Sequence, residues 1–127
     1  MNPDGFISNF TEWAADQPEI VAVVLIGSHA RGEAGPESDI DLVVVTTVPG
    51  KFLDNAAWTE TFGIADSLTI EDWGRVQSVR VFYNGGPEVE FGITAPDWAA
   101  KPDDATRDIL SKGHKVLLDR NEIFASG

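Results

Sequence analysis

The chain has 127 residues, and its 9 basic and 21 acidic residues give it a formal net charge of −12. This length fits a single domain over residues 1–127 and is too short for a catalytic domain joined to a complete substrate-recognition domain. The acidic balance disfavours DNA or long RNA as a partner, because nucleic-acid-binding proteins usually present a basic surface to the phosphates. The absence of cysteine excludes disulfide bonds and thiolate metal sites.

The sequence also lacks the signals of secretion and membrane insertion. Residues 1–4 are polar and acidic, unlike the start of a secretory signal peptide. The longest apolar run, Ile20–Ile26, is far too short to cross a membrane as a helix. We therefore expect a soluble, cytoplasmic protein with no membrane partner.

The first part of the chain predicts a helix followed by two buried strands. The helix is expected to begin at Asn2-Pro3, with asparagine as the cap, and to end before Pro18. Its apolar face comprises Phe6, Phe10, Trp13 and Ala14. The runs Ile20–Ile26 and 40–47 are apolar and rich in β-branched residues, which is typical of strands buried on both faces.

Short helices are expected on either side of the second strand. Residues 28–33 predict a helix that ends before Gly35-Pro36. After the turn at Pro49-Gly50, residues 51–62 predict another helix with several inward apolar side chains. Residues 64–73 alternate only weakly between apolar and polar, so their structure is ambiguous.

The rest of the chain predicts a β-hairpin, a helix and a last strand. Residues 76–83 and 89–94 are the hairpin strands, joined by the turn Asn84-Gly85-Gly86. Residues 103–112 predict a helix and residues 115–118 a short strand. This order favours an α/β (α+β) fold in which a mixed β-sheet carries helices mainly on one face.

A glycine-serine corner and two aspartates carry the chemistry of the sequence. Gly27-Ser28 ends a strand and opens a helix, where free backbone N–H groups favour a bound phosphate. Asp39 and Asp41 are two residues apart on a strand, so both carboxylates point to the same face. Such a pair is tolerated when a divalent cation lies between the carboxylates, and Mg²⁺ prefers carboxylate and phosphate oxygens.

Glu90 is the candidate third carboxylate. It interrupts the apolar run 89–94, and a buried carboxylate needs a partner, which a shared metal ion would supply. Glu90 could also act as a general base that takes the proton of an attacking hydroxyl. Glu88 lies on the same strand face and is the alternative if the register differs.

Two segments, residues 27–32 (GSHARG) and 38–42 (SDIDL), resemble the signature of the polymerase-beta-like nucleotidyltransferase superfamily, especially its minimal bacterial and archaeal members. The resemblance is sharpest over residues 25–45 and looser over residues 80–120. It implies the nucleotidyltransferase fold. It also implies transfer of a nucleoside monophosphate, AMP from ATP in many members, to a hydroxyl of a small molecule or protein, with release of pyrophosphate.

The resemblance also implies roles for single residues. Gly27 and Ser28 would hold the nucleoside triphosphate, and Arg31 would contact its phosphates. The catalytic residues, which would also hold two Mg²⁺ ions, would be Asp39, Asp41 and Glu90. Many members have aspartate at the third position, so the glutamate here is a departure from the family pattern.

Each of these residues also has a structural explanation. Gly27-Ser28 could be a strand-ending turn with a helix cap, and Asp39 could serve turn chemistry. Arg31 and Glu90 could be solvated. If an internal arginine or lysine bound Asp39 or Asp41, a structural role would account for that aspartate.

Some aromatic and basic residues leave their roles open. Trp73 and Trp98 could stack on an adenine base, although tryptophans more often belong to a core. Arg75 and Arg80 could face the substrate, but the sequence does not constrain them. His29 is adjacent to the glycine-serine corner, and a surface position is expected for it.

The identity of the acceptor leads to alternative functions. The antibiotic-modifying members of the superfamily carry an additional helical domain that contacts the acceptor, and this chain ends soon after its catalytic core. A homodimer or a helical partner protein would then complete the site. The alternatives are an antitoxin that neutralises a helical toxin and a non-catalytic nucleotide-binding module.

Overall fold

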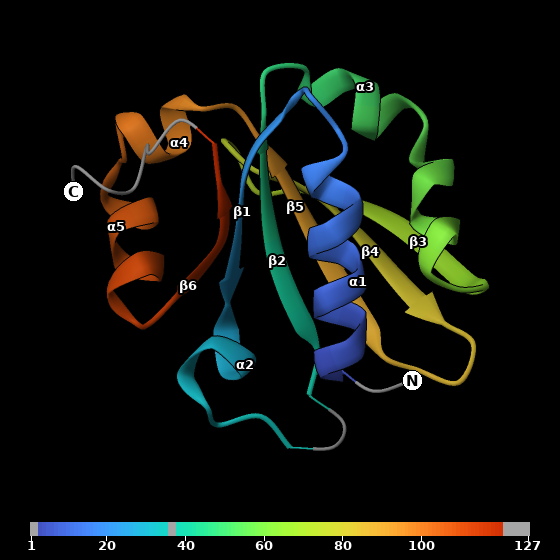
Figure 1. Cartoon of the computed structure of the whole chain (residues 1–127). Coiled ribbons are helices and arrows are strands. Elements are labelled where there is room, and N and C mark those ends of the chain that lie inside the picture. Colours follow the sequence, from blue (N-terminus) through green and yellow to red (C-terminus); the bar gives the residue numbers. More distant parts are fainter. Residues whose placement is uncertain (1–2, 36–37, 121–127) are drawn as a thin grey trace.

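The computed structural model describes residues 3–35 and 38–120 and contains a six-stranded mixed β-sheet with helices on both faces (Figure 1). In chain order the elements are α1 (Pro3–Ala15), β1 (Ile20–Ile26), α2 (Gly27–Arg31), β2 (Ile40–Thr46), α3 (Pro49–Asp54), the 3₁₀ helix η1 (Ala56–Phe62), β3 (Ala65–Asp72), β4 (Gln77–Tyr83), β5 (Glu88–Thr94), α4 (Asp97–Ala100), α5 (Asp104–Ser111) and β6 (Lys115–Asp119). The predicted mixed α/β architecture is confirmed.

The strand order β3-β4-β5-β2-β1-β6 brings together segments that are distant in the sequence (Figure 1). β2 and β5 pair in parallel at the centre of the sheet, with Ile40 opposite Val89 and Asp41 opposite Glu90. The β4–β5 hairpin continues this register on the next strand, because Arg80 is opposite Glu90. Side chains at such positions point to the same face of the sheet.

The larger hydrophobic core lies between the sheet and the helices α1, α3 and η1. Phe6 and Phe10 of α1 are fully buried, and their ring centroids lie 6.2 and 5.2 Å from that of Phe91 on β5. Trp58 of η1 packs edge-on against the same phenylalanine at 4.9 Å. The helical face predicted for α1 therefore anchors the helices to the centre of the sheet.

A smaller core lies on the opposite face, under α4 and α5. Trp98 of α4 is 2% exposed and packs with Val24 and Val43 of the sheet, and Leu110 of α5 packs against the same group. This cover lies over β1 and β2 and does not bury Asp41, so a polar part of the sheet surface stays open to solvent.

The predicted helix over residues 51–62 is wrong in one respect, because it is divided at Asn55. The backbone of Asn55 is extended, with φ −138° and ψ 101°, and its side-chain oxygen accepts a hydrogen bond from the Ala57 N–H at 3.0 Å. Asparagine favours this capping position, so η1 begins as a separate segment. The short helix α4 was not predicted, and the ambiguous residues 64–73 contain β3.

Several further boundaries differ slightly from the predicted ones. β2 begins at Ile40, so Asp39 directly precedes the strand, and Asp103 caps α5 through a hydrogen bond from the Thr106 N–H. The predicted cap Asn2 and the break at Pro36 lie outside the described residues.

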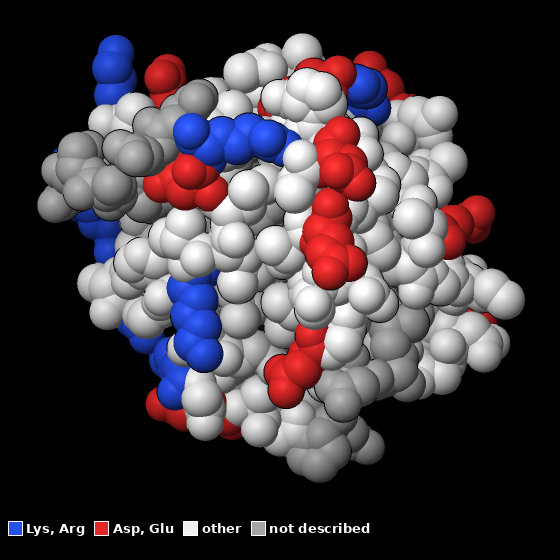
Figure 2. Space-filling model, in the orientation of Figure 1, with Lys and Arg blue, Asp and Glu red and all other residues white. Residues whose placement is uncertain are grey.

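Charged side chains are unevenly distributed over the face shown in Figure 2, where acidic groups follow α1 and basic groups gather beside β6. Among the described residues on this face, the basic groups form no continuous surface that could follow a nucleic-acid backbone. No helix in the described part of the chain has the length and apolar character needed to cross a bilayer.

Candidate active site

The turn from β1 into α2 lies against the carboxylate of Asp41. Gly27 has a left-handed backbone, with φ +75°, and a Cβ at this position would lie 2.5 Å from Oδ2 of Asp41. The contact arises because Ile26, the last residue of β1, pairs with Asp41 across the antiparallel ladder. Glycine is therefore required here both by the backbone conformation and by the adjacent carboxylate.

Four carboxyl groups form two pairs at the start of the adjacent strands β2 and β5, with Asp39 directly before β2. Asp41 lies beside Glu90, its partner across the ladder, and Asp39 lies beside Glu88. Burial, followed by the nearby Glu90 and then Asp39, raises the pKa of Asp41 to about 7, against an ordinary value of 3.8. Burial and the contact with Asp39 likewise raise the pKa of Glu88, while Arg80 opposes the shift. Such pairs favour a bound proton or a cation over two free charges.

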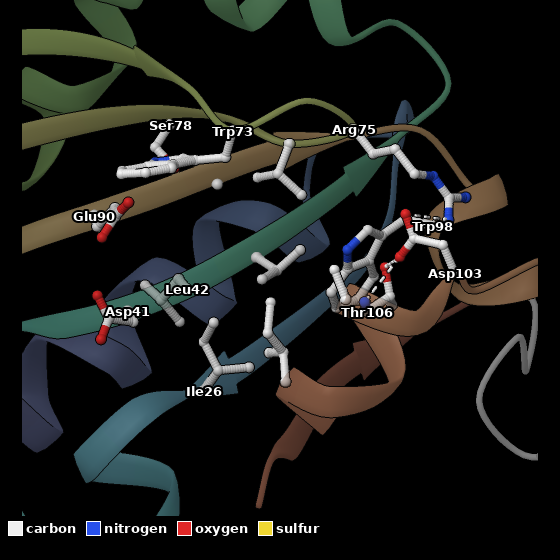
Figure 3. A pocket seen from close by; sticks show the side chains of 15 residues that line it. Ile26, Asp41, Leu42, Trp73, Arg75, Ser78, Glu90, Trp98, Asp103 and Thr106 are labelled. Carbon is white, nitrogen blue, oxygen red and sulfur yellow. Dashed lines mark hydrogen bonds and ion pairs between the residues drawn. The ribbon is translucent and has the colours of Figure 1, made fainter. Parts of the chain in front are cut away.

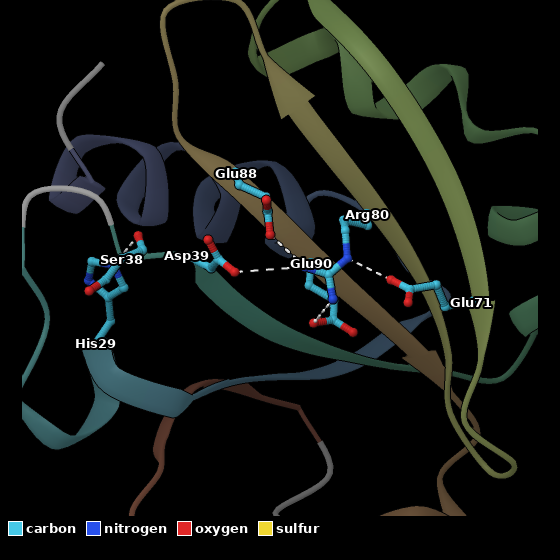
Figure 4. Close-up of polar contacts among 7 residues, drawn as sticks. All are labelled: His29, Ser38, Asp39, Glu71, Arg80, Glu88 and Glu90. Carbon is cyan, nitrogen blue, oxygen red and sulfur yellow. Dashed lines mark hydrogen bonds and ion pairs between the residues drawn. The ribbon is translucent and has the colours of Figure 1, made fainter.

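Arg80 of β4 lies among these acids and contacts four carboxylates (Figure 4). Its Nε donates to Glu71 at 2.6 Å, its Nη1 to Glu88 at 2.5 Å and its Nη2 to Glu90 at 3.2 Å. The same Nη1 is 3.7 Å from Oδ2 of Asp39, near the outer limit of an ion pair. These carboxylates, Glu71 first, raise the pKa of Arg80 above its ordinary value, so it remains charged.

Arg80 is thus the internal arginine that a structural explanation of Asp39 requires. However, one positive charge faces five carboxylates, because Asp41 joins the four that Arg80 contacts. The side chain of Asp39 is also 44% exposed, against 24% for Arg80. A single arginine therefore leaves the cluster strongly negative.

A cavity of about 370 Å³ opens beside the acid pairs, between the sheet and α5. Asp41 and Glu90 lie at one end, and Arg75 and Asp103 lie at the other (Figure 3). Its walls are largely apolar, and they include the exposed Trp73 at the turn between β3 and β4. A pocket with an acidic end and an aromatic wall has the character of a small-molecule site.

Residues 9–82, more than half of the chain, match the family model described as nucleotidyltransferase domain. The chain belongs to this family. The expected likeness to polymerase-beta-like nucleotidyltransferases is thereby confirmed. No functionally curated protein matches the sequence significantly.

Solved nucleotidyltransferases share the fold of this domain. An aminoglycoside 6-adenyltransferase from Bacillus subtilis aligns with a TM-score of 0.65 and 16% identity, over 90% of this chain and 40% of that protein. A CCA-adding enzyme in complex with CTP aligns with a TM-score of 0.53 and 19% identity, over 93% of this chain and 28% of the enzyme. Terminal uridylyl transferase 4 from Trypanosoma brucei, with bound UPU, aligns with a TM-score of 0.50 and 16% identity, over 71% of this chain and 34% of that one.

These identities show the shared fold and do not extend to substrates. The nucleotidyltransferase domain spans only 28–40% of the length of these structures. The three proteins also differ in their named substrates, so the fold does not select the nucleotide or the acceptor.

The structure brings some of the predicted site residues together and separates others. Gly27, Asp39, Asp41 and Glu90 meet where the inner strands β1, β2 and β5 adjoin, at one end of these strands. Arg31 is directed elsewhere, because its Nε lies 3.3 Å from Glu33 on the exposed side of α2.

His29 has a contact that the sequence did not suggest. Its Nε2 lies 3.2 Å from the backbone oxygen of Ser38, the residue before Asp39 (Figure 4). This contact links α2 to the segment that carries the first aspartate of the site.

The position of Arg80 was missed by sequence reasoning, although a signal for it exists. In the hairpin closed by the turn 84–86, Phe82 pairs with Glu88, and Arg80 therefore pairs with Glu90. Counting outward from a recognised hairpin turn gives this register directly.

The residues present fit Mg²⁺ in their chemistry but are not arranged around an ion. Carboxylate oxygens on neighbouring strands are suitable ligands, and the glycine at position 27 leaves space beside Asp41. Yet within residues 3–35 and 38–120, no three acidic or histidine side chains converge as a ready-made metal site. Arg80 also contacts both Asp39 and Glu90, two of the three candidate ligands.

Proposed function

We propose that this domain is a magnesium-dependent adenylyltransferase, which transfers AMP from ATP to a hydroxyl and releases pyrophosphate. The observation that supports this most is the half-buried pair Asp41–Glu90, which lies against Gly27 at one end of the pocket. A pair of carboxyl groups is unsuited to binding a free nucleotide, whose phosphates are also anionic. The pair is suited to binding a nucleotide together with a divalent cation.

Asp39, Asp41 and Glu90 are the residues that would hold the metal. Bound Mg²⁺ would supply neutralisation of the phosphate oxygens and alignment of the attacking and leaving oxygens. The backbone of Asp41 is fixed by the central ladder, whereas Asp39 directly precedes β2 and lies outside that ladder.

The remaining contacts follow from the shape of the site. Gly27-Ser28 would receive the triphosphate at the start of α2. The nucleoside would enter the apolar part of the pocket, where the exposed ring of Trp73 offers a stacking surface. Glu90 would accept the proton of the attacking hydroxyl.

Calorimetric titration of the purified chain with ATP tests the metal assignment. We expect binding in Mg²⁺ and weak binding in EDTA, with Asp41→Asn removing this difference because the cation loses its central ligand. The matched control is Asp66→Asn, which removes the same charge from β3, where Asp66 is bonded to Asn84 away from the site. Metal-dependent ATP binding that survives in Asp41→Asn would contradict the assignment.

Transfer itself can be followed with radiolabelled ATP and the cell lysate of the source organism. Glu90→Gln should lower incorporation of label by about 100-fold or more, the scale of a lost general base, while nucleotide binding survives in part. Glu88→Gln is the comparison, since Glu88 lies on the same face but pairs with Asp39. Undiminished transfer in Glu90→Gln would move the role to Glu88.

A second candidate function is neutralisation of a helical partner protein, and exposed apolar residues favour it. On the edge strand β3, Leu68 and Ile70 are 37% and 52% exposed and point to the same face. Ile64, just before this strand, is 76% exposed. Exposed apolar groups of this kind mark surfaces for association.

The first test is whether a short neighbouring gene encodes an all-helical protein, and co-expression with that protein is the second. We expect the two proteins to purify together and Ile70→Glu to separate them. Recovery of the complex with Ile70→Glu would place the interface elsewhere.

A further inference from the structure

We propose that Arg80 is a positioning residue that acts as an internal counter-ion of the metal site and must withdraw from Asp39 and Glu90 before a divalent cation is bound. This inference rests on the proposed function, because it takes the same carboxylates as metal ligands. It concerns the state of the site before loading, which the proposed function leaves open.

The contacts of Arg80 fall into two groups by their length. Nε is bonded at 2.6 Å to Glu71, which belongs to β3 and lies outside the acid pairs of β2 and β5. Nη1 is bonded at 2.5 Å to Glu88, which is also outside the proposed ligands. The contacts with the candidate ligands are longer, with Nη2 3.2 Å from Glu90 and Nη1 3.7 Å from Asp39 (Figure 4). Arg80 is therefore anchored by its two short bonds, to Glu71 and Glu88, and makes its longer contacts with the candidate ligands.

The Nη contacts and a bound cation compete for the same carboxylates, those of Asp39 and Glu90. Mg²⁺ requires close, near-octahedral oxygen ligands, and an adjacent guanidinium would both repel the ion and occupy the lone pairs it needs. Glu71 and Glu88 offer Arg80 a place to remain when Asp39 and Glu90 turn to the metal.

The arrangement gives Arg80 opposite effects on folding and on metal binding. Before loading, its charge offsets the repulsion among the carboxylates, so the acid pairs can remain together. During loading, the same charge opposes the incoming ion. Removing Arg80 should therefore tighten metal binding, whereas a residue that merely held the site in shape would weaken binding when removed.

The test is a titration of the full-length chain with Mn²⁺ alone, with free Mn²⁺ measured by electron paramagnetic resonance. Arg80→Gln should tighten binding by about tenfold, the order expected for one nearby unit charge in a partly exposed site. Arg107→Gln is the control of equal charge change, since Arg107 is exposed and paired with Asp104 on α5. Arg80→Lys keeps the positive charge but loses the planar guanidinium with its several N–H donors, and it should give an intermediate affinity.

A second variant changes Glu71, the partner of Arg80 Nε, and leaves Arg80 in place. This test can be carried out even if Arg80→Gln does not fold. Glu71→Gln releases Nε and should weaken Mn²⁺ binding by several-fold more than Asp66→Asn, the control on the same strand. Unchanged or weaker binding in Arg80→Gln, or equal effects of the Glu71 and Asp66 variants, would overturn the proposal. If wild type and Asp41→Asn bind Mn²⁺ equally, the proposed function itself fails.

Discussion

Gly27 and Gly32 bracket α2, and both have left-handed backbones, with φ +75° and +72°. They differ in their surroundings, because a Cβ at position 27 would meet Asp41 whereas one at position 32 would meet no atom within 4 Å. Alanine at either position should cost about 1–2 kcal/mol of the free energy of unfolding for the left-handed backbone. Urea denaturation measures this cost.

The two alanine variants should differ in function. Gly27→Ala forces the Asp41 carboxylate to turn away, so metal-dependent ATP binding should be lost, while Gly32→Ala should retain it. Calorimetry in Mg²⁺ and in EDTA separates the two. Equal loss in both variants would mean that the backbone strain, and not the contact with Asp41, controls the site.

The raised pKa of Asp41 makes stability depend on pH in the metal-free protein. Folding raises this pKa from 3.8 to about 7, so the folded state binds more protons than the unfolded state between these values. Stability should therefore fall as the pH rises from about 4 to about 7. Asp41→Asn cannot ionise, so it should not lose stability as the pH rises. At pH 8 it should be more stable than the wild type by roughly 1–2 kcal/mol, allowing for partial solvent screening, with little gain at pH 4.

Thermal unfolding in EDTA at both pH values checks this expectation, with Asp66→Asn as the exposed-carboxylate control. A stabilisation of Asp41→Asn that is equal at pH 4 and pH 8 would rule out the proposed linkage. In Mg²⁺ and ATP the sign should reverse, because ligand binding then stabilises only the wild type.

At the level of the elements, the turn after β3 and the helix α4 carry two tryptophans with different environments. Trp73 is 62% exposed and lines the pocket, whereas Trp98 is 2% exposed in the smaller core. Trp73→Ala should weaken ATP binding by about 1–3 kcal/mol with stability nearly unchanged. Trp98→Ala should instead destabilise the fold by about 3–5 kcal/mol. Fluorescence-monitored titration measures ATP binding, and urea denaturation measures stability. A Trp98→Ala variant that is stable but binds ATP weakly would place Trp98, and not Trp73, against the nucleotide.

The elements that the sequence predicted well are those with a strong local signal. The β-branched runs at Ile20–Ile26 and 40–47, and the glycine turn after Tyr83, identify strands without tertiary information. The division at Asn55 was missed because residues 51–62 keep a helical apolar pattern across a residue that caps a new segment. α4 is too short, over Asp97–Ala100, to show a periodicity.

At the level of the whole molecule, both cores share one sheet, so the described residues should unfold as a unit. β1 and β2 contribute Val23 and Val44 to the larger core and Val24 and Val43 to the smaller one. Tryptophan fluorescence and far-UV circular dichroism should therefore give coincident urea transitions, as expected for a single domain. Separate midpoints would show that the α4–α5 region unfolds independently of the α1 side.

The site was predictable only as far as its residues are local in sequence. The spacing of Gly27 and Asp41 suggested a shared site, and Glu90 was suggested by a charge within an apolar strand. The role of Arg80, on β4, depends on both neighbouring strands and on the next one, because its partners lie on β3, on β5 and just before β2. No local pattern specifies such a set.

The parallel ladder between β2 and β5 also determines when the site can form. Asp41 and Glu90 become neighbours only after the chain between them has closed a long loop, and such distant contacts slow folding. A nascent chain released up to the end of β4 would already contain the glycine corner and both aspartates, yet it would lack the opposing strand. During synthesis the acidic centre is therefore incomplete until the hairpin returns, so the capacity to bind a nucleotide is acquired late.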